Sequence, residues 1–174
     1  MNEKLDTDFF KQDVLKVAPL LIGKLLVRRF SDGEIKKYRI TETEAYRGEE
    51  DTACHARCGK TNRTAVLYKK GGTSYVYLCY GIHYLLNIVT GNIDEPQAAL
   101  IRGVEGYDGP AKLTKVLKID KTLNDIDITT SSELWIEDDG YKVNYVSDKR
   151  VGIDYATEPY KSIDWRFIMK KDQF

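Results

Sequence analysis

Several protein classes are excluded by what this sequence lacks. No apolar run among its 174 residues approaches the length of about eighteen that a membrane-spanning helix requires. The first residues, M-N-E-K-L-D-T-D, are polar and acidic, and they do not resemble a secretory signal. We therefore expect no signal peptide, no association with a membrane and a cytoplasmic location.

Cysteine and histidine are scarce. The chain has three cysteines and two histidines, and all of them lie between residues 40 and 87. Cys54, His55 and Cys58 lie close together, but the third cysteine is distant and the second histidine occupies a strand-like run, so the set falls short of zinc-ligand spacing. Because the cytoplasm keeps thiols reduced, we expect free cysteines and no metal site.

The sequence has no excess of either charge, with 27 basic and 27 acidic residues. A protein that binds nucleic-acid phosphates usually has a basic balance, so DNA binding by this chain would require segregated charges. The local pattern allows segregation, although it fits a solvated surface equally well. Acidic residues gather at 120–127 and 133–139. Basic residues cluster before a tyrosine-rich run: Arg57, Lys60, Arg63, Lys69 and Lys70.

The length and a hydrophobic content of 42% predict a single domain over residues 1–174. Strand-like runs joined by hairpin turns, without βαβ alternation, are typical of an α+β fold. We expect a curved, mostly antiparallel sheet with a protruding β-hairpin and a few surrounding helices.

Turn and capping residues place the elements along the chain. Asp13 is suited to cap a short helix. Asp32-Gly33 is suited to a hairpin turn, and a second hairpin is expected around Tyr80-Gly81. The predicted helical segments are 14–21, 64–68 and 110–119. The predicted strands are 24–30, 35–45, 73–78, 82–90, 97–104, 134–137, 142–147 and 163–169.

Acidic and aromatic side chains alternate along one predicted strand. Alternation sends Glu42, Glu44 and Tyr46 to the same face of the sheet. The loop that follows brings Asp51 and His55 back within reach, and loops after strands often carry sites. Two carboxylates on one face can form a general acid–base pair, a metal site or an exposed edge, and the pattern leaves all three open.

Tyrosines dominate the second hairpin. Tyr75, Tyr77 and Tyr84 are expected on one face of their strands, where each buried hydroxyl group needs a hydrogen-bond partner. Tyr80 differs because it stands beside Gly81 at the tip, where a large aromatic side chain is exposed. Such a ring can stack on a nucleobase or on a protein partner.

Two polar side chains interrupt apolar strands. Asn87 lies among leucine, isoleucine and valine residues, so it serves either as a hydrogen-bonded structural amide or as a specificity contact. Arg102 lies in the apolar run 98–104, where a guanidinium group needs a carboxylate partner.

These residues belong to an ordered set of short motifs that covers roughly residues 14–170. The first is E-T-E-A-Y-x-G-x-x-D-x-A-x-H from Glu42, followed by Y-V-Y-x-x-Y-G-x-x-x-x-x-N from Tyr75 and L-I-R-x-x-E from Leu100. G-P-x-K-L, R-V-G-I and W-R-F follow later in the chain. Together they resemble the alkyladenine DNA glycosylase family, also called the 3-methyladenine DNA glycosylases.

The resemblance implies a monofunctional DNA repair glycosylase. Such an enzyme flips an alkylated or deaminated purine out of duplex DNA and hydrolyses the N-glycosidic bond, leaving an abasic site for base excision repair. The resemblance also implies double-stranded DNA with damaged purines as the partner, a monomeric chain and no cofactor. Because the Glu44 motif contains no lysine, a Schiff-base lyase step is not expected.

Position by position, the resemblance assigns two catalytic roles. Glu44 matches the residue that activates the attacking water, and one carboxylate can also stabilise the positive charge that develops on the sugar. Arg102 matches an arginine that helps hold the water and a nearby phosphate. Glu42 is left without a catalytic role, and we expect it to be structural and paired with an arginine.

Further residues match positions that contact the DNA. Tyr46, His55 and Tyr77 match the side chains that sandwich the flipped base. Asn87 matches the residue that crowds the exocyclic amine of normal guanine, and Tyr80 matches the wedge that intercalates into the duplex. Electron-rich rings attract the positive charge of bases such as 3-methyladenine.

Two alternatives from other classes stay open. A non-catalytic module that binds damaged DNA would use the same aromatic residues, although Glu44 argues against it. A protein-interaction domain could use Tyr80 and its neighbours. The chain departs from the family pattern at His83, where a tyrosine or methyl-bearing residue is common, and at Ala111, where glycine is usual.

Overall fold

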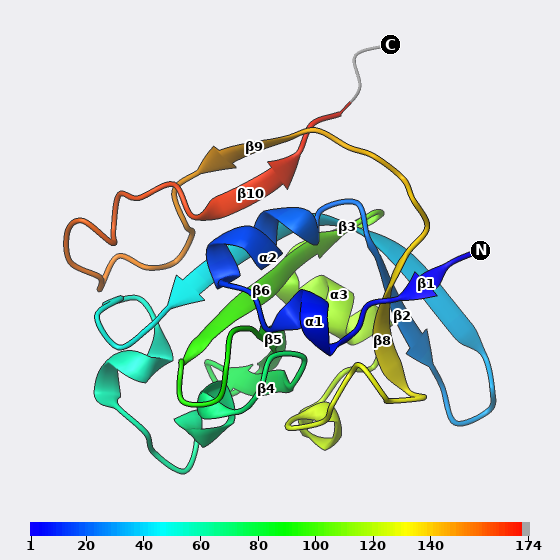
Figure 1. The fold of residues 1–174 in the computed structure, drawn as a ribbon, viewed down its shortest axis with the longest axis horizontal. Coiled ribbons are helices and arrows are strands. Elements are labelled where there is room, and N and C mark those ends of the chain that lie inside the picture. Colours follow the sequence, from blue (N-terminus) through cyan, green and yellow to red (C-terminus); the bar gives the residue numbers. More distant parts are fainter. Residues whose placement is uncertain (172–174) are drawn as a thin grey trace.

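The fold combines an antiparallel sheet with a few short helices (Figure 1). This computed structural model describes residues 1–171, so the last three residues of the predicted domain, 172–174, lie outside the described part. Every strand pairing within residues 1–171 is antiparallel, and the predicted α+β fold is confirmed. The strands are β1 (Glu3–Lys4), β2 (Leu25–Arg29), β3 (Ile35–Arg47), β4 (Ser74–Cys79), β5 (His83–Val89), β6 (Gln97–Val104), β7 (Tyr107–Asp108), β8 (Leu134–Asp138), β9 (Tyr145–Asp148) and β10 (Arg166–Met169).

Short helices and 3-10 turns surround the sheet. The Asp13 side chain caps α2 by accepting a hydrogen bond from the Leu15 N–H, as predicted. Pro19 lies inside α2 near its end, and Pro110 occupies the first turn of α3. The helices are α1 (Thr7–Phe10), α2 (Val14–Leu20) and α3 (Pro110–Val116), and the 3-10 turns are η1 (His55–Cys58), η2 (Thr64–Tyr68) and η3 (Lys121–Leu123).

Strand β3 connects two parts of the sheet. Its first half pairs with β2, and its second half pairs with β6 and β10. The sheet order is β1-β8-β2-β3-β6-β5-β4. The register shifts between Ile40 and Thr43, a place where a strand can bend. Thr43 donates a hydrogen bond to the Ala18 carbonyl of α2 at 2.8 Å, so the next residue, Glu44, points to the face away from α2.

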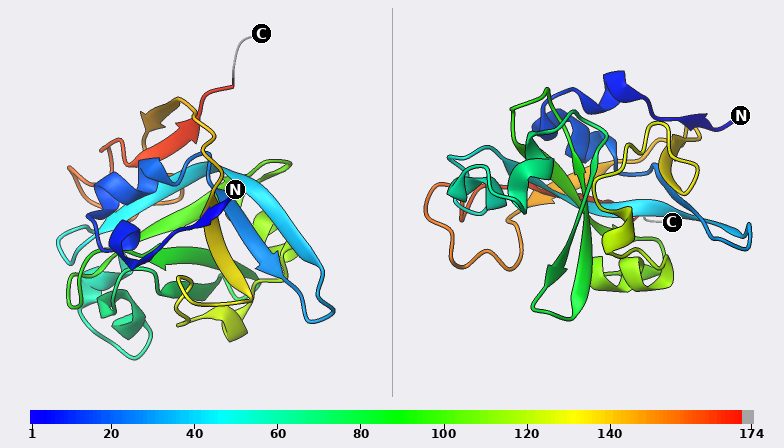
Figure 2. Two further views of the ribbon diagram at one scale, coloured as in Figure 1. Left: turned by 45° about the vertical axis from the view of Figure 1, so that its right-hand side comes forward. Right: turned by 90° about the horizontal axis from the view of Figure 1, so that it is seen from below.

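The main hydrophobic core holds the sheet against α2 and α3. Val17 of α2, Ile101 of β6 and Leu113 of α3 are all fully buried in it. A second cluster packs Leu67 of η2 and Tyr75 of β4 together. The β4–β5 hairpin projects from the body beside α3, on the side opposite α2 (Figure 2, right). The core therefore holds the base of the hairpin and leaves its tip free.

Most of the predicted elements occur, with shifts at their ends. Strand β6 has the predicted bounds, whereas β3 extends to Arg47 and β9 begins at Tyr145, three residues later than predicted. The predicted loop 47–63 contains the turn η1. The short elements β1, α1, β7 and η3 were not predicted.

The predicted face of Tyr84 is wrong. Cys79 pairs with His83, which leaves an odd number of residues in the turn. Tyr77 consequently pairs with Leu85, and Tyr84 lies on the opposite face and packs against the main core.

The segregation of charge that the sequence allows does not extend to part of the basic cluster. The ion pairs Lys69–Asp125 and Lys70–Asp127 both have N–O distances of 2.6 Å. The acidic run 120–127 therefore lies beside these lysines and neutralises them. The arginines of the cluster instead line the cavity described below.

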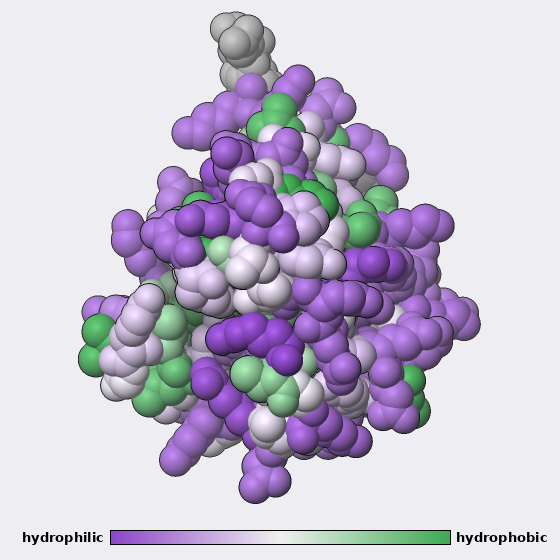
Figure 3. All heavy atoms as spheres, turned by 90° about the vertical axis from the view of Figure 1, so that its left-hand side faces the viewer, coloured by the Kyte–Doolittle hydropathy of each residue, from purple (hydrophilic) through white to green (hydrophobic). Residues whose placement is uncertain are grey.

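On the face seen in Figure 3, the described residues are largely hydrophilic, and the hydrophobic ones form small separate patches. Within residues 1–171, no helix has both the length and the apolar character needed to cross a membrane.

Candidate active site

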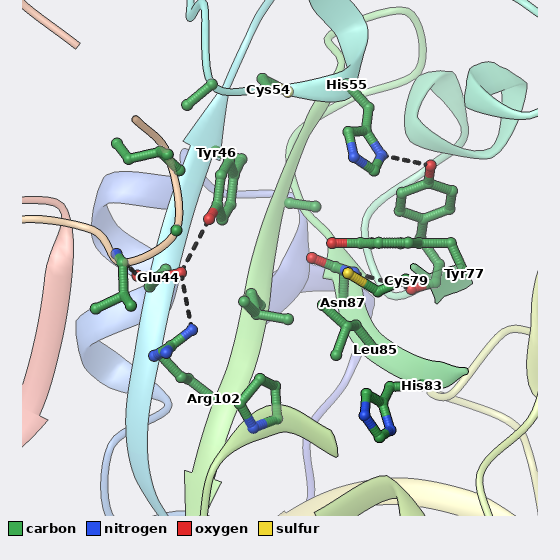
Figure 4. Close-up of a pocket in the computed structure, with 18 of the residues that line it drawn as sticks. Glu44, Tyr46, Cys54, His55, Tyr77, Cys79, His83, Leu85, Asn87 and Arg102 are labelled. Atoms are coloured by element: carbon green, nitrogen blue, oxygen red, sulfur yellow. Dashed lines mark hydrogen bonds and ion pairs between the residues drawn. The ribbon is translucent and has the colours of Figure 1, made fainter. Parts of the chain in front are cut away.

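A cavity of about 520 Å³ opens between β3, the β4–β5 hairpin, the start of α3 and the segment that begins at Val151 (Figure 4). Its volume is in the range of pockets that hold small organic ligands. The structure brings all the sequence-predicted site residues to this one cavity. They are Glu44, Tyr46, His55, Tyr77, Tyr80, Asn87 and Arg102.

Glu44 lies at one side of the cavity and is fully buried. Its Oε1 accepts a hydrogen bond from the Tyr46 hydroxyl at 2.9 Å, and its Oε2 accepts one from the Val151 N–H at 2.7 Å. Burial raises the pKa of Glu44 above its usual range, and the positive charge of Arg102 and the Val151 N–H partly oppose that rise. The carboxylate is thus held in one orientation and made more basic.

Arg102, on β6, lies between the two glutamates of β3. Its Nε is 3.3 Å from Glu42 Oε1, and its Nη1 is 3.7 Å from Glu44 Oε1. Arg166 Nη1 also contacts Glu42 Oε1, at 3.1 Å. The predictions that Arg102 needs a carboxylate and that Glu42 pairs with an arginine are therefore confirmed.

Aromatic rings form two facing walls. Tyr46 projects from β3, and His55 and Tyr77 project from the other side of the cavity (Figure 4). The His55 and Tyr77 ring centroids are 4.6 Å apart with an interplanar angle of 63°. Burial raises the pKa of both Tyr46 and Tyr77, so their hydroxyl groups stay protonated. The space between the walls, which we call the aromatic slot, suits a planar ring.

His55 is neutral at physiological pH. Burial, together with the positive charges of Arg63 and Arg57, lowers the pKa of His55 to about 4. Its Nδ1 is 2.8 Å from the Tyr75 hydroxyl, which holds the imidazole in place. The Arg63 guanidinium lies 5.1 Å from the centroid of the Tyr77 ring. The slot therefore has cations at its rim and an uncharged imidazole in its wall.

Asn87 and Tyr80 lie at different depths on the same hairpin. The Asn87 side chain is buried and donates a hydrogen bond to the Tyr75 carbonyl at 3.2 Å, while it also lines the cavity. Tyr80 sits at the tip with a left-handed φ of 52° and an exposed fraction of 90%. Its neighbour Ile82 is 70% exposed. The hairpin thus presents an aromatic tip to solvent.

Sequence reasoning missed residues far from β3 in the sequence that hold the site residues in place. Val151 binds Glu44, and Arg150 pairs with Asp51 through Nη1–Oδ2 and Nη2–Oδ1 distances of 2.7 and 2.9 Å. Tyr75 was expected beside Tyr77, but its contact with the histidine was not. The R-V-G-I motif is the one sequence signal that points to Arg150 and Val151.

The thiols near the cavity do not form a metal-binding cluster. Within residues 1–171, no group of three or more His, Cys, Asp or Glu side chains could hold a metal ion. Burial raises the pKa of Cys54 to about 12, so this thiol stays protonated beside His55. Cys58 is exposed, and Cys79 is partly buried at the end of β4.

The chemistry available here is that of one basic carboxylate beside an aromatic slot. Glu44 can accept a proton from a water molecule and can stabilise positive charge that develops nearby. The facing rings can hold a planar heterocycle. Glu42 is poorly suited to the same task because two guanidinium groups already share its Oε1.

Comparison with known proteins gives a match over almost the whole chain. A family model described as "Methylpurine-DNA glycosylase (MPG)" matches residues 8–108 and 106–173. A relative from Borrelia garinii subsp. bavariensis is 45% identical over 183 residues, and one from Natranaerobius thermophilus is 42% identical over 195 residues; each alignment covers 98% of both chains. Both are named "Putative 3-methyladenine DNA glycosylase". The chain therefore belongs to the methylpurine-DNA glycosylase family.

Proposed function

We propose that this protein is a DNA repair glycosylase that releases alkylated or deaminated purines from duplex DNA. The observation that carries the proposal is one buried carboxylate, Glu44, held at the side of an aromatic slot. Family membership and the names of the relatives support DNA glycosylase activity and a methylated purine as substrate.

Glu44 acts as the general base. Its carboxylate takes a proton from a water molecule, and the water oxygen bonds to C1′ of the deoxyribose. The bond from C1′ to the purine nitrogen breaks, and its electron pair leaves with the base. A cationic alkylated base leaves neutral, whereas a neutral base takes up a proton as it leaves. The carboxylate also stabilises the positive charge on the sugar in the transition state.

Hydrolysis is the expected end of the reaction. None of the described residues that line the cavity is a lysine, so the cavity offers no side-chain amine for a Schiff base with the sugar. The product is an abasic site, which enters base excision repair. Arg102, 3.7 Å from Glu44, helps to hold the water and the neighbouring phosphate.

The damaged nucleotide reaches the slot by flipping out of the duplex. Unstacking a base costs a few kcal/mol, and less for a damaged pair. Tyr80, 90% exposed at the hairpin tip, enters the duplex and fills the space that the nucleotide leaves. Tyr46 then stacks on one face of the base, and His55 and Tyr77 on the other. Asn87 excludes normal guanine by crowding its exocyclic amine.

The central test is Glu44→Gln. We expect base release to fall by about a hundredfold to ten-thousandfold, because the general base is lost while the shape of the side chain is kept. The measurement is single-turnover formation of abasic sites in duplexes that carry hypoxanthine or 3-methyladenine, together with binding to the same duplexes. Abasic sites forming at nearly the wild-type rate would refute the role of Glu44. Binding of damaged duplex by a wild-type protein that releases no base would instead indicate a non-catalytic module.

Tyr80→Ala tests the wedge. We expect the flipped state to weaken on the order of tenfold, because stacking of one ring on a base contributes about 1–3 kcal/mol. An etheno-adenine duplex reports flipping through its fluorescence. A matched control is Tyr141→Ala, since Tyr141 is also an exposed tyrosine but does not line the cavity. Full flipping by Tyr80→Ala would show that the tip is not the wedge.

A further inference from the structure

A guanidinium group lies fully buried behind the aromatic slot. Arg150 binds both oxygens of Asp51, and it also donates to the carbonyls of Ala45 at 2.9 Å and Tyr160 at 3.0 Å. Its Nε is the one buried side-chain nitrogen or oxygen in the described part of the chain that has no hydrogen-bond partner. A buried ion pair commonly stabilises a fold no better than apolar residues of similar volume would. Stability alone therefore does not account for this pair.

The pair ties together the segments that enclose the cavity. Ala45 belongs to β3, and Asp51 belongs to the loop after it. Asp51 also accepts hydrogen bonds from the N–H groups of Arg47 at 2.9 Å and Ala53 at 3.0 Å. Arg150 directly precedes the segment that begins at Val151 and lines the cavity beside Glu44. One ion pair thus fixes the loop and the later segment relative to each other.

Arg150 also supports both hydrogen bonds that orient Glu44. The N–H of the next residue, Val151, donates to Oε2 of Glu44 at 2.7 Å. The Arg150 guanidinium carbon lies 4.8 Å from the centroid of the Tyr46 ring, whose hydroxyl donates to Oε1 at 2.9 Å. Trp165 also contacts the guanidinium group, with 5.1 Å between its ring centroid and the same carbon. Arg150 therefore contacts the donor to Oε1, Tyr46, and directly precedes the donor to Oε2, Val151.

We propose that Arg150, through its ion pair with Asp51, is a positioning residue that fixes the Glu44 carboxylate and the Tyr46 ring for base release. This inference rests on the proposed function. Arg150 acts through Val151 and Tyr46 and does not itself touch the DNA. A general base works only when it lies within hydrogen-bond reach of its proton, and small displacements of reacting groups can cost about a hundredfold in rate.

The chain contains a matched control for this cluster. Arg39 binds both oxygens of Asp139, at 3.2 and 2.8 Å, and lies 4.2 Å from the centroid of the Tyr141 ring. The Arg–Asp–Tyr set is the same as in the Arg150 cluster, but this ion pair is 19% and 22% exposed where the Arg150 pair is fully buried, and none of these three residues lines the cavity. Disrupting this pair separates a general loss of structure from a loss of positioning.

The experiment compares Asp51→Asn/Arg150→Met with Arg39→Met/Asp139→Asn on a duplex that carries one hypoxanthine. For the first pair we expect single-turnover base release to fall about tenfold to a hundredfold, while the Kd for the duplex changes less than about threefold. For the control pair we expect release within about twofold of wild type. Arg150→Lys keeps the charge without the planar fork, so its release should also be reduced. It is the variant to use if the double variant fails to fold.

A second readout does not depend on activity. Titration of the Glu44 carboxyl carbon, followed by carbon-13 NMR, should show a higher pKa in the Asp51→Asn/Arg150→Met protein, because the Val151 N–H that lowers the pKa in the wild type would no longer be held on Oε2. The variant removes the opposite charges of Arg150 and Asp51 together. Arg102 and the Tyr46 hydroxyl face Glu44 in both proteins. An unchanged titration, or release equal to that of the control pair, would overturn the proposal. Wild-type protein that releases no base would refute the proposed function, whereas the titration would still test the positioning.

Discussion

Glu42 and Glu44 are two residues apart on β3, and Arg102 contacts both, yet their surroundings differ sharply. The Glu42 side chain is 21% exposed, and its Oε1 is shared by Arg102 and Arg166. Glu44 has no exposed side-chain surface, and its two oxygens accept hydrogen bonds from a hydroxyl group and a backbone N–H. Strand alternation alone would make these two carboxylates equivalent.

The difference shows how two carboxylates on one face of a strand can be held in different surroundings. Two guanidinium groups compensate the charge of Glu42, which therefore links β3 to β6 and β10. Glu44 faces a cavity and has one arginine at 3.7 Å, so burial dominates and raises its pKa. A carboxylate with a raised pKa is the stronger base, provided that the pH is high enough for it to be ionised.

Arg102→Met should have the largest effect after Glu44→Gln, because it removes the cation that the two glutamates share. Arg102 lowers the pKa of Glu44, so its loss should raise that pKa further. Glu44 would then become protonated at a higher pH, and the acidic limb of the pH–rate profile should move upward. We also expect release at neutral pH to fall on the order of tenfold, as for a lost charge-assisted contact. Single-turnover rates from pH 5 to 9 would measure both effects. An acidic limb at the wild-type pH would show that Arg102 does not set the pKa of Glu44.

Glu42→Gln should have the smallest effect on catalysis. We expect base release within about threefold of wild type and an acidic limb at the same pH, since Glu44 keeps both of its hydrogen bonds. The ion pairs to Arg102 and Arg166 would be lost, which should cost about 1 kcal/mol and lower the Tm by about 2–4 °C. Thermal unfolding and the same excision assay measure the two quantities. A loss of activity comparable to that of Glu44→Gln would show that Glu42 takes part in the reaction.

The parts of the fold that local signals mark were predicted well. The run 97–104 is bounded by polar and turn residues, and β6 has these bounds. The cap at Asp13 and the family resemblance were likewise confirmed. Strand β9 was misplaced because all its residues are exposed, so it has no alternation of buried and exposed positions to mark it. Tyr84 was misplaced because the number of residues in the turn decides which face a strand presents.

The sequence by itself determined which side chains lie near one another along the chain. It placed Glu44 and Tyr46 on one face of a strand and Tyr80 at a hairpin tip, since strand alternation and turn chemistry act over a few residues. Only the tertiary structure decided how Glu44 is held. Val151 lies 107 positions from Glu44, and Arg150 lies 99 positions from Asp51. Contacts over such separations form only when the whole sheet has folded, and no local pattern records them.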